Sequence, residues 1–358
     1  MNLLEIAKQR LINQQISVTK IKTTVEMVAW LCAVQAQEYA QTKWALGLRL
    51  LRLTDHDVEN DFTEGRILRT HLLRPTWHFV TAQDIRWLLM LTAPRVHAAN
   101  AYMYRKLELD VAVFNRCNDI LIKTLQGNKQ LTRNAINQEI KKNKIVAEGH
   151  RLSYIMMQAE LEGIICSGAR QENQFTYALL DERVPVCNAK NHDEALADLT
   201  LRYFKSRGPA TIKDFSTWSG ITLTDCKRGL SMVKSNFLQE KVDNEEFFFS
   251  AYTSADIKQF QDIYLLPIYD EFLMGYKNSR DVIFGFRNSL SPEPAAFQFD
   301  NTIIFEGQII GTWKRTIKPK SIDLEYDFFK PLNKKQFNSF KKAIHRFEEF
   351  NALTVNYE

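Results

Sequence analysis

The stretch at residues 69–80 reads RTHLLRPTWHFV, and it contains two short runs of strand-forming residues. The runs are residues 69–73 and 77–80, and Arg74-Pro75-Thr76 lies between them as a turn. Helical spacing of apolar residues precedes this stretch and returns after Gln83. Helices followed by a two-stranded hairpin form the pattern of a winged-helix unit, so the sequence predicts such a unit here.

The residues around this hairpin predict a series of helices. Thr23 or Thr24 can cap one of them, because a threonine hydroxyl accepts from the unpaired backbone donors of a helix start. Pro94 is expected to break or kink the later helical run into two pieces, because proline lacks the backbone donor. Helical segments are expected at residues 3–13, 25–34, 44–50 (short or irregular), 55–62 and 83–103.

The order of helices and hairpin repeats twice more. In the second unit, Thr132 is expected to cap one helix and Ser153 the next, which ends at Gly163. In the third unit, Thr211 and Asp214 resemble a capping box, with Asp in place of the usual Glu. The expected strands of these two units lie at residues 164–166, 174–179, 237–242 and 246–250.

After about residue 255 the alternation typical of strands dominates. Residues 302–305 and 308–313 flank Glu306-Gly307, which predicts a hairpin, and residues 322–328 predict a further strand. An amphipathic helix is expected over 333–350. This part of the chain therefore reads as a small α+β domain.

Together the patterns predict an α+β chain of tandem winged-helix (helix-turn-helix) units followed by a C-terminal β-rich domain. The expected parts are a first winged-helix unit at 1–110, a second at 111–190, a third at 191–255, and an α+β domain with a basic hairpin at 256–358.

Composition narrows the class of protein. The chain has 358 residues, 45% apolar and 25% charged, which is ordinary for a globular protein, and its net charge of +5 is compatible with nucleic acid. Its N-terminus is not expected to be a signal peptide, and no apolar run reaches membrane-spanning length. Cysteines stand at 32, 117, 166, 187 and 226 without a C-x-x-C pair, so neither a zinc site nor a disulfide frame is expected. A reducing cytoplasm is the expected setting.

Two glutamines, Gln35 and Gln37, follow the second predicted helix and flank the small residue Ala36. In a continuous helix their side chains would point roughly 200° apart, because each residue turns about 100°. The two amides can share one target only if the helix ends near Val34 and the chain then turns or extends. On its own, a Q-A-Q sequence on a helix surface is common and carries little information.

Several segments resemble the winged-helix alkylpurine DNA glycosylases of the AlkZ and YcaQ type. They are Gln35-Ala36-Gln37, the hairpin at 69–80, LLPIYDEFLMGY at 265–276 and GTWKR at 311–315, so the resemblance spans nearly the whole chain. It implies tandem winged helices in a C-shaped arrangement, and excision of alkylated purines or unhooking of interstrand crosslinks. It also implies that Gln35 and Gln37 are the catalytic pair. Glutamine at both positions is similar to the AlkZ branch, whereas YcaQ-type members have an acidic second residue.

Neutral glutamines suit a substrate that is already charged. A purine alkylated at N7 carries a positive charge that weakens its glycosidic bond, so no strong general acid is needed, in contrast to ordinary glycoside hydrolysis. A glutamine carbonyl can accept a hydrogen bond from water and direct a dipole at an oxocarbenium-like sugar. We therefore expect a monofunctional hydrolase without a cofactor or metal.

Other residues are candidates for DNA contact or support. In the first wing, phosphate or sugar contact is one interpretation, and packing of His71 and Trp77 on a neighbouring helix is the other. Asp270 and Glu271 could hold a water or a glutamine amide, or have a structural role at a strand end. The DNA-binding candidates are Arg69, His71, Arg74, Trp77 and His78 in the wing and Lys314 and Arg315, with Lys318 and Lys320, in the C-terminal hairpin.

The expected partner is double-stranded DNA with alkylated purines, bound by a monomer in the cytoplasm at the nucleoid, without a membrane. The alternative is a non-enzymatic winged-helix DNA-binding protein or transcription regulator. It predicts sequence-specific binding to undamaged DNA and no release of base. A third reading is a family member that binds damaged DNA without excision.

Overall fold

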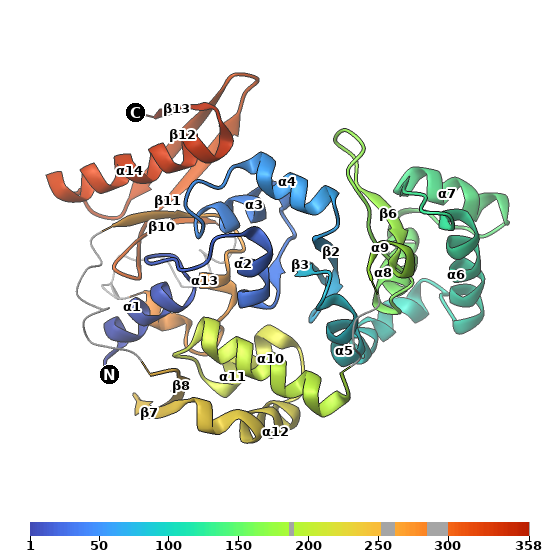
Figure 1. The fold of residues 1–358 in the computed structure, drawn as a ribbon, viewed down its shortest axis with the longest axis horizontal. Helices are drawn as coiled ribbons and strands as arrows, with labels where there is room; N and C mark the ends of the chain where they lie inside the picture. The colour runs from blue at the N-terminus through green and yellow to red at the C-terminus, as the bar shows by residue number, and fades with distance from the viewer. Residues whose placement is uncertain (186–189, 252–261, 285–299, 358) are drawn as a thin grey trace. The chain divides into compact units, whose positions relative to one another are not determined.

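The computed structural model describes residues 1–185, 190–251, 262–284 and 300–357, and the chain divides into two compact units (Figure 1). Unit 1 comprises Met1–Glu59, Ala197–Trp218 and Thr222–Glu358, and unit 2 comprises Asn60–Leu196 with Ser219–Ile221. The predicted division into four parts stays a prediction, and its boundary near 255 lies outside the described residues. Cys187, one of the five cysteines, also lies outside them.

Unit 1 begins with helices whose ends follow local capping rules. Helix α1 (Leu3–Asn13) is capped by Asn2 and matches the prediction, and α2 (Thr24–Leu31) is capped by Thr23, whose side chain accepts from the Glu26 amide. The Glu26 side chain accepts in return from the Thr23 amide, as in a capping box. Helices α3 (Tyr39–Gly47) and α4 (Asp55–Thr63) follow, and α4 leads into unit 2.

A helix-turn-helix with a hairpin follows later in the chain. The predicted capping box is confirmed, because the Thr211 hydroxyl accepts from the Asp214 amide while Asp214 accepts from the Thr211 amide. Asp243 (φ 47°) and Asn244 (φ 66°) make the two-residue hairpin turn. The elements are α10 (His192–Arg207), α11 (Ile212–Ser219), α12 (Leu223–Val233), η1 (Lys234–Asn236), β7 (Leu238–Val242) and β8 (Glu245–Phe249).

The C-terminal part of unit 1 is a five-stranded sheet with α14 (Lys334–Asn351) packed against it (Figure 1). The strand order is β13-β12-β11-β10-β9, with β12 and β13 parallel and the other pairs antiparallel. The ring of Trp313 meets that of Phe347 on α14 at 5.3 Å, and the predicted Glu306-Gly307 hairpin turn is confirmed. The elements are β9 (Ile263–Leu266), α13 (Glu271–Met274), η2 (Arg280–Ile283), β10 (Asn301–Phe305), β11 (Gln308–Ile317), β12 (Ser321–Phe328) and β13 (Thr354–Tyr357).

Unit 2 opens with the predicted hairpin, formed by β2 (Ile67–Leu72) and β3 (Thr76–Thr81), in which His71 lies opposite Trp77. Helix α5 (Ile85–Lys106) continues through Pro94, so the predicted break was wrong, and the alternative of a kink stays a prediction. The proline costs roughly 3 kcal/mol in a helix interior. Buried apolar side chains on both sides of Pro94, namely Leu88, Leu89, Leu91, Ala93 and Val96, offset this cost by packing.

The remaining elements of unit 2 repeat the helix and hairpin order with one different boundary. Thr132 caps α7 as predicted. Ser153 does not cap α8, because the helix begins at Gly149 and the Ser153 hydroxyl donates back to the Gly149 carbonyl inside the first turn. The elements are α6 (Val111–Leu125), β4 (Leu131–Thr132), α7 (Arg133–Lys142), α8 (Gly149–Leu161), β5 (Ile165–Ser167), β6 (Thr176–Leu179) and α9 (Leu180–Arg183), with the strands in the order β4-β6-β5.

The second helices of the two later repeats differ in exposure. Residues 155–161 of α8 are all buried, so the C-terminal half of this helix has no face for a DNA groove. Helix α12 exposes Thr224, Lys227 and Arg228. Within the described ranges, no helix is both long and apolar enough to cross a membrane.

Candidate functional site at the glutamine turn

The helix before the glutamine pair ends where the pair requires it to end. Helix α2 stops at Leu31, and Cys32 has φ 65° and ψ −47°. The Ala33 amide donates to the Leu31 carbonyl at 2.8 Å, which closes a three-residue γ-turn of the rare positive-φ type. A two-residue strand, β1 (Val34–Gln35), follows the turn. Gln35 and Gln37 therefore lie in extended or bent chain and not on a helix, and the opposed directions expected of a continuous helix do not apply.

The backbone of Gln35 is held at both of its polar groups. Its amide donates to Oε1 of Glu271 at 2.8 Å, and its carbonyl accepts from the Thr42 hydroxyl at 3.1 Å. The Gln35 side chain is buried, whereas that of Gln37 is partly exposed. The first glutamine is thus fixed within unit 1, and the second reaches its surface.

Glu271, at the start of α13, is buried and makes contacts with both oxygens. Oε1 accepts from the Gln35 amide, and Oε2 accepts from Arg207 (Nη2 at 2.6 Å, Nε at 3.1 Å) and from the Trp218 indole at 2.9 Å. Glutamate and arginine are both fully buried, and the guanidinium lies 4.2 Å from the Trp218 ring centroid. Glu271 therefore holds the glutamine turn through the backbone amide of Gln35.

Asp270 makes a separate buried ion pair with Arg49. Both carboxylate oxygens accept from this guanidinium at 2.8 Å, and Oδ1 also accepts from the Phe272 amide to cap α13. Arg49 donates further to the carbonyls of Gln14 and Ala45. These contacts agree with a structural role for Asp270, which was one of the two alternatives from the sequence.

Two buried tyrosines lie near Arg207. The hydroxyl of Tyr276 donates to the Arg207 carbonyl at 2.7 Å, and that of Tyr203 donates to the Gly275 carbonyl at 2.8 Å. Burial raises the pKa of Tyr276 to about 12, and it also raises the pKa of Tyr203 well above the usual value. Both phenols therefore stay protonated at neutral pH and act as hydrogen-bond donors.

The lysine nearest to the glutamines in sequence is fully engaged. The Lys43 ammonium lies 2.7 Å from Asp55 and 2.7 Å from Glu59, and Glu59 also accepts from the Tyr39 hydroxyl at 3.1 Å. An ammonium held between two carboxylates is a poor nucleophile, because attack requires the neutral amine.

The first wing buries most of its proposed DNA contacts. His71 pairs through Nδ1 with the carboxylate of Glu160, and Nδ1 of the fully buried His78 donates to the Thr76 carbonyl at 3.0 Å. Arg69 is buried, with its guanidinium 4.1 Å from the ring centroid of Trp77. These three side chains pack inside the wing. They have little exposed surface with which to contact DNA.

Two wing residues keep exposed surface. Trp77 is half-buried, with Arg69 over its ring and the His71 ring 4.4 Å away, and Arg74 at the turn is also half-buried. Arg74 and Trp77 are therefore the members of the wing set that can reach a ligand.

In the C-terminal hairpin, neighbouring cations face opposite sides of the sheet. Lys314 is exposed, whereas Arg315 is half-buried with its guanidinium 5.7 Å from the Phe347 ring. Burial lowers the pKa of Arg315 while the Asp55 and Glu38 carboxylates raise it. Successive strand residues point to opposite faces, so Lys314 and Arg315 cannot share one phosphate.

Sequence reasoning missed the residues that hold the turn. Arg207 precedes Gly208-Pro209 at a helix end, where a cation usually faces solvent, and nothing in the sequence indicates that Trp218 contacts Glu271. No spacing links Arg207 to Leu31, since 176 positions separate them. The contacts of Arg207 with Glu271 and with the end of α2 become recognisable only in three dimensions.

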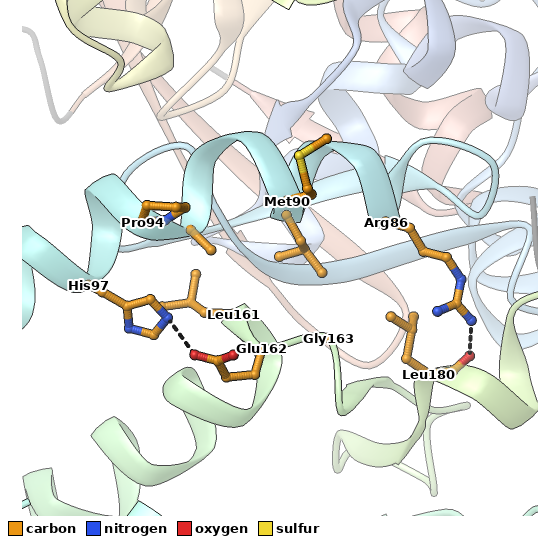
Figure 2. Close-up of a pocket in the computed structure, with 10 residues that line it drawn as sticks. Arg86, Met90, Pro94, His97, Leu161, Glu162, Gly163 and Leu180 are labelled. Atoms are coloured by element: carbon orange, nitrogen blue, oxygen red, sulfur yellow. Dashed lines mark hydrogen bonds and ion pairs between the residues drawn. The ribbon is translucent and has the colours of Figure 1, made fainter. Parts of the chain in front are cut away.

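A cavity of about 360 Å³ lies in unit 2 between α5 and the end of α8 (Figure 2). It is lined by Met90, Pro94 and Leu161, with His97 3.2 Å from Glu162 at one end and Arg86 beside the Leu180 carbonyl at the other. None of the predicted site residues is among its lining residues. Within the described ranges, no group of three or more His, Cys, Asp or Glu side chains could hold a metal ion.

The sequence and the fold match a known family of proteins. The family model of AlkZ-like DNA glycosylases matches residues 28–350, so this chain belongs to the AlkZ-like DNA glycosylase family. Among its relatives is the interstrand DNA cross-link repair glycosylase of Streptomyces sahachiroi, 19% identical over 301 residues and covering 81% of each chain. The solved structure of the DNA glycosylase AlkZ from the same organism superposes with a TM-score of 0.80 over 100% of both chains at 18% identity. The resemblance seen in the sequence is confirmed, and the α+β fold is shared.

Proposed function

We propose that this protein hydrolyses the N-glycosidic bond of purines that carry a positive charge from alkylation at N7. We propose that Gln35 and Gln37 are its catalytic residues. The observation that carries the proposal is the end of α2 at Leu31, which places both glutamines in non-helical chain with the Gln35 backbone fixed. Family membership supports glycosylase chemistry.

The division of labour follows from the exposure of the two side chains. Gln37, which is partly exposed, is proposed to hold the attacking water through its side-chain carbonyl. Gln35, which is buried, orients that water or the sugar. An amide dipole aimed at the oxocarbenium-like sugar stabilises the developing charge without ionising.

The charged base leaves without a strong acid. Glu271 is the buried carboxylate at this turn, and its oxygens already receive hydrogen bonds from Gln35, Arg207 and Trp218. It is therefore poorly suited to protonate a leaving group. A site of this kind favours cationic purines and acts weakly on neutral bases such as uracil, whose glycosidic bond needs more assistance.

The DNA backbone is proposed to be bound by cations that keep exposed surface. Lys314 in the C-terminal hairpin and Arg74 in the first wing contribute charge, and Trp77 offers a partly exposed ring. Phosphate contacts of this type give affinity without sequence readout.

Unhooking of interstrand crosslinks extends the same chemistry. The Streptomyces sahachiroi relative bears the name of an interstrand DNA cross-link repair glycosylase. A crosslink attached at N7 of a purine presents the same cationic leaving group as a single adduct, so one site can act on both.

Free-base analysis tests the proposed function. Duplexes containing 7-methylguanine or uracil are incubated with the protein, and released base is measured by chromatography. We expect 7-methylguanine to appear with an abasic site left in an intact strand, and uracil release to be far slower. Absence of released base together with tight binding to one undamaged sequence would support the transcription regulator instead.

A further inference from the structure

We propose that the buried Arg207–Glu271 ion pair is a positioning device that sets the γ-turn before the glutamines and so aims both amides. The inference rests on the proposed function of Gln35 and Gln37. Arg207 and Glu271 are positioning residues in this proposal, since they act on the reaction through the chain they hold.

One ion pair satisfies three backbone groups at alternate positions. Arg207 donates from Nη1 to the Leu31 carbonyl at 2.8 Å and from Nη2 to the Ala33 carbonyl at 2.9 Å, and Glu271 accepts the Gln35 amide at 2.8 Å. The two carbonyls flank Cys32. The pair therefore spans the whole passage from the helix to the first glutamine.

The held segment is strained. A residue other than glycine at φ 65° and ψ −47° adopts a conformation that is costly unless its surroundings impose it, and such residues gather at functional sites. The Leu31 carbonyl is also at a helix end, where it lacks a helical partner and favours a cation. Arg207 supplies that cation and bridges both ends of the turn.

The surrounding packing fixes the arginine. The Trp218 ring lies under its guanidinium, and Gly275 leaves space for its side chain, because a Cβ there would lie 3.1 Å from Cδ of Arg207. Buried ion pairs are often no more stabilising than apolar residues of similar volume. Stability alone therefore does not account for this arrangement, whereas control of the turn does.

The neighbouring Arg49–Asp270 pair provides a matched control. It is equally buried and adjacent in sequence to Glu271, but Arg49 donates to the Gln14 and Ala45 carbonyls and Asp270 caps the start of α13. Glu271→Gln and Asp270→Asn each replace one carboxylate by an amide of the same shape. An amide has one acceptor oxygen where the carboxylate has two, so Glu271→Gln must give up either the Gln35 amide or the Arg207 and Trp218 donors.

The test measures single-turnover release of 7-methylguanine and DNA affinity, at a temperature where all variants are folded. We expect both variants to lower the melting temperature, but only Glu271→Gln to slow base release, by about 10- to 100-fold with affinity unchanged, as expected for misplaced reacting groups. Equal rates for Glu271→Gln and Asp270→Asn would overturn the inference. If Glu271→Gln does not fold, Trp218→Phe removes one donor to Oε2, and a several-fold loss of rate is expected; wild-type rates would overturn it.

A double-mutant cycle separates positioning from general damage. On a Gln35→Ala/Gln37→Ala background, Glu271→Gln should have little further effect, because neither amide is then left to aim. Independent losses that multiply would show that Glu271 acts elsewhere. Failure of the proposed function is a different result, in which wild type releases no base or Gln35→Ala and Gln37→Ala leave the rate unchanged.

Discussion

Replacement of Gln37 by alanine removes the amide proposed to hold the attacking water. The side chain is partly exposed in a bend after β1, so its loss opens no core cavity, and the free energy of unfolding should change by less than about 0.5 kcal/mol. The loss of one positioned transition-state hydrogen bond should slow base release by roughly 10- to 1000-fold, or about 1.4 to 4 kcal/mol of barrier. DNA affinity should be nearly unchanged, since phosphate contacts provide most of it.

The assay is single-turnover release of 7-methylguanine with enzyme in excess, combined with a binding titration at fixed salt. Glu38→Gln is the matched control, because Glu38 is the exposed neighbour of Gln37 and caps no helix with its side chain. It should leave the rate near that of wild type. Loss of activity in Glu38→Gln with full activity in Gln37→Ala would refute the assignment of the water to Gln37.

A carboxylate at the same position gives the complementary result. Gln37→Glu should keep activity or acquire a new pH dependence, because a carboxylate can act as a base and stabilise positive charge. Its contribution should be present above the ordinary glutamate pKa of about 4.3 and be lost as the pH falls through that value. Gln35→Ala should slow release more mildly than Gln37→Ala.

The remaining predictions concern binding and reaction type. Arg74→Ala or Lys314→Ala should weaken binding to all duplexes alike and reduce the salt dependence by about one unit of slope; a changed preference among undamaged sequences would favour the regulator. Borohydride treatment during reaction should trap no covalent DNA adduct, because Lys43 is held by two carboxylates; a trapped adduct would refute monofunctional hydrolysis. Activity should persist in EDTA, and loss with recovery on adding zinc would contradict the expectation of a metal-free reaction.

Local sequence signals predicted the elements well where neighbours in the chain determine them. Thr23, Thr132 and the pair Thr211 and Asp214 cap helices as expected, because a capping hydrogen bond spans only three residues. The predicted break at Pro94 is wrong, because tertiary packing on both sides of the proline outweighs the local cost of proline in a helix. The exposure of the wing side chains could not be predicted either, because it depends on distant residues. His71, for example, is buried against Glu160, which is 89 positions away in the sequence.

The sequence predicted the two glutamines of the candidate site, but not the residues that hold the turn before them. The sequence indicated that Gln35 and Gln37 require a helix end, and α2 does end at Leu31. The γ-turn at Cys32 could not be predicted, because no glycine or asparagine marks the positive φ. Its stabilising contacts come from Arg207 and Glu271, which tertiary folding brings together from distant segments.

The most direct test of the central claim compares wild type with the double variant Gln35→Ala/Gln37→Ala on duplex DNA containing 7-methylguanine. Both proteins should be folded by circular dichroism and should bind the duplex with similar affinity. We predict that wild type releases the free base and that the double variant releases it at least about tenfold more slowly, in keeping with the loss of positioned hydrogen bonds. Release by the double variant as fast as by wild type would show that the glutamine turn does not carry the chemistry.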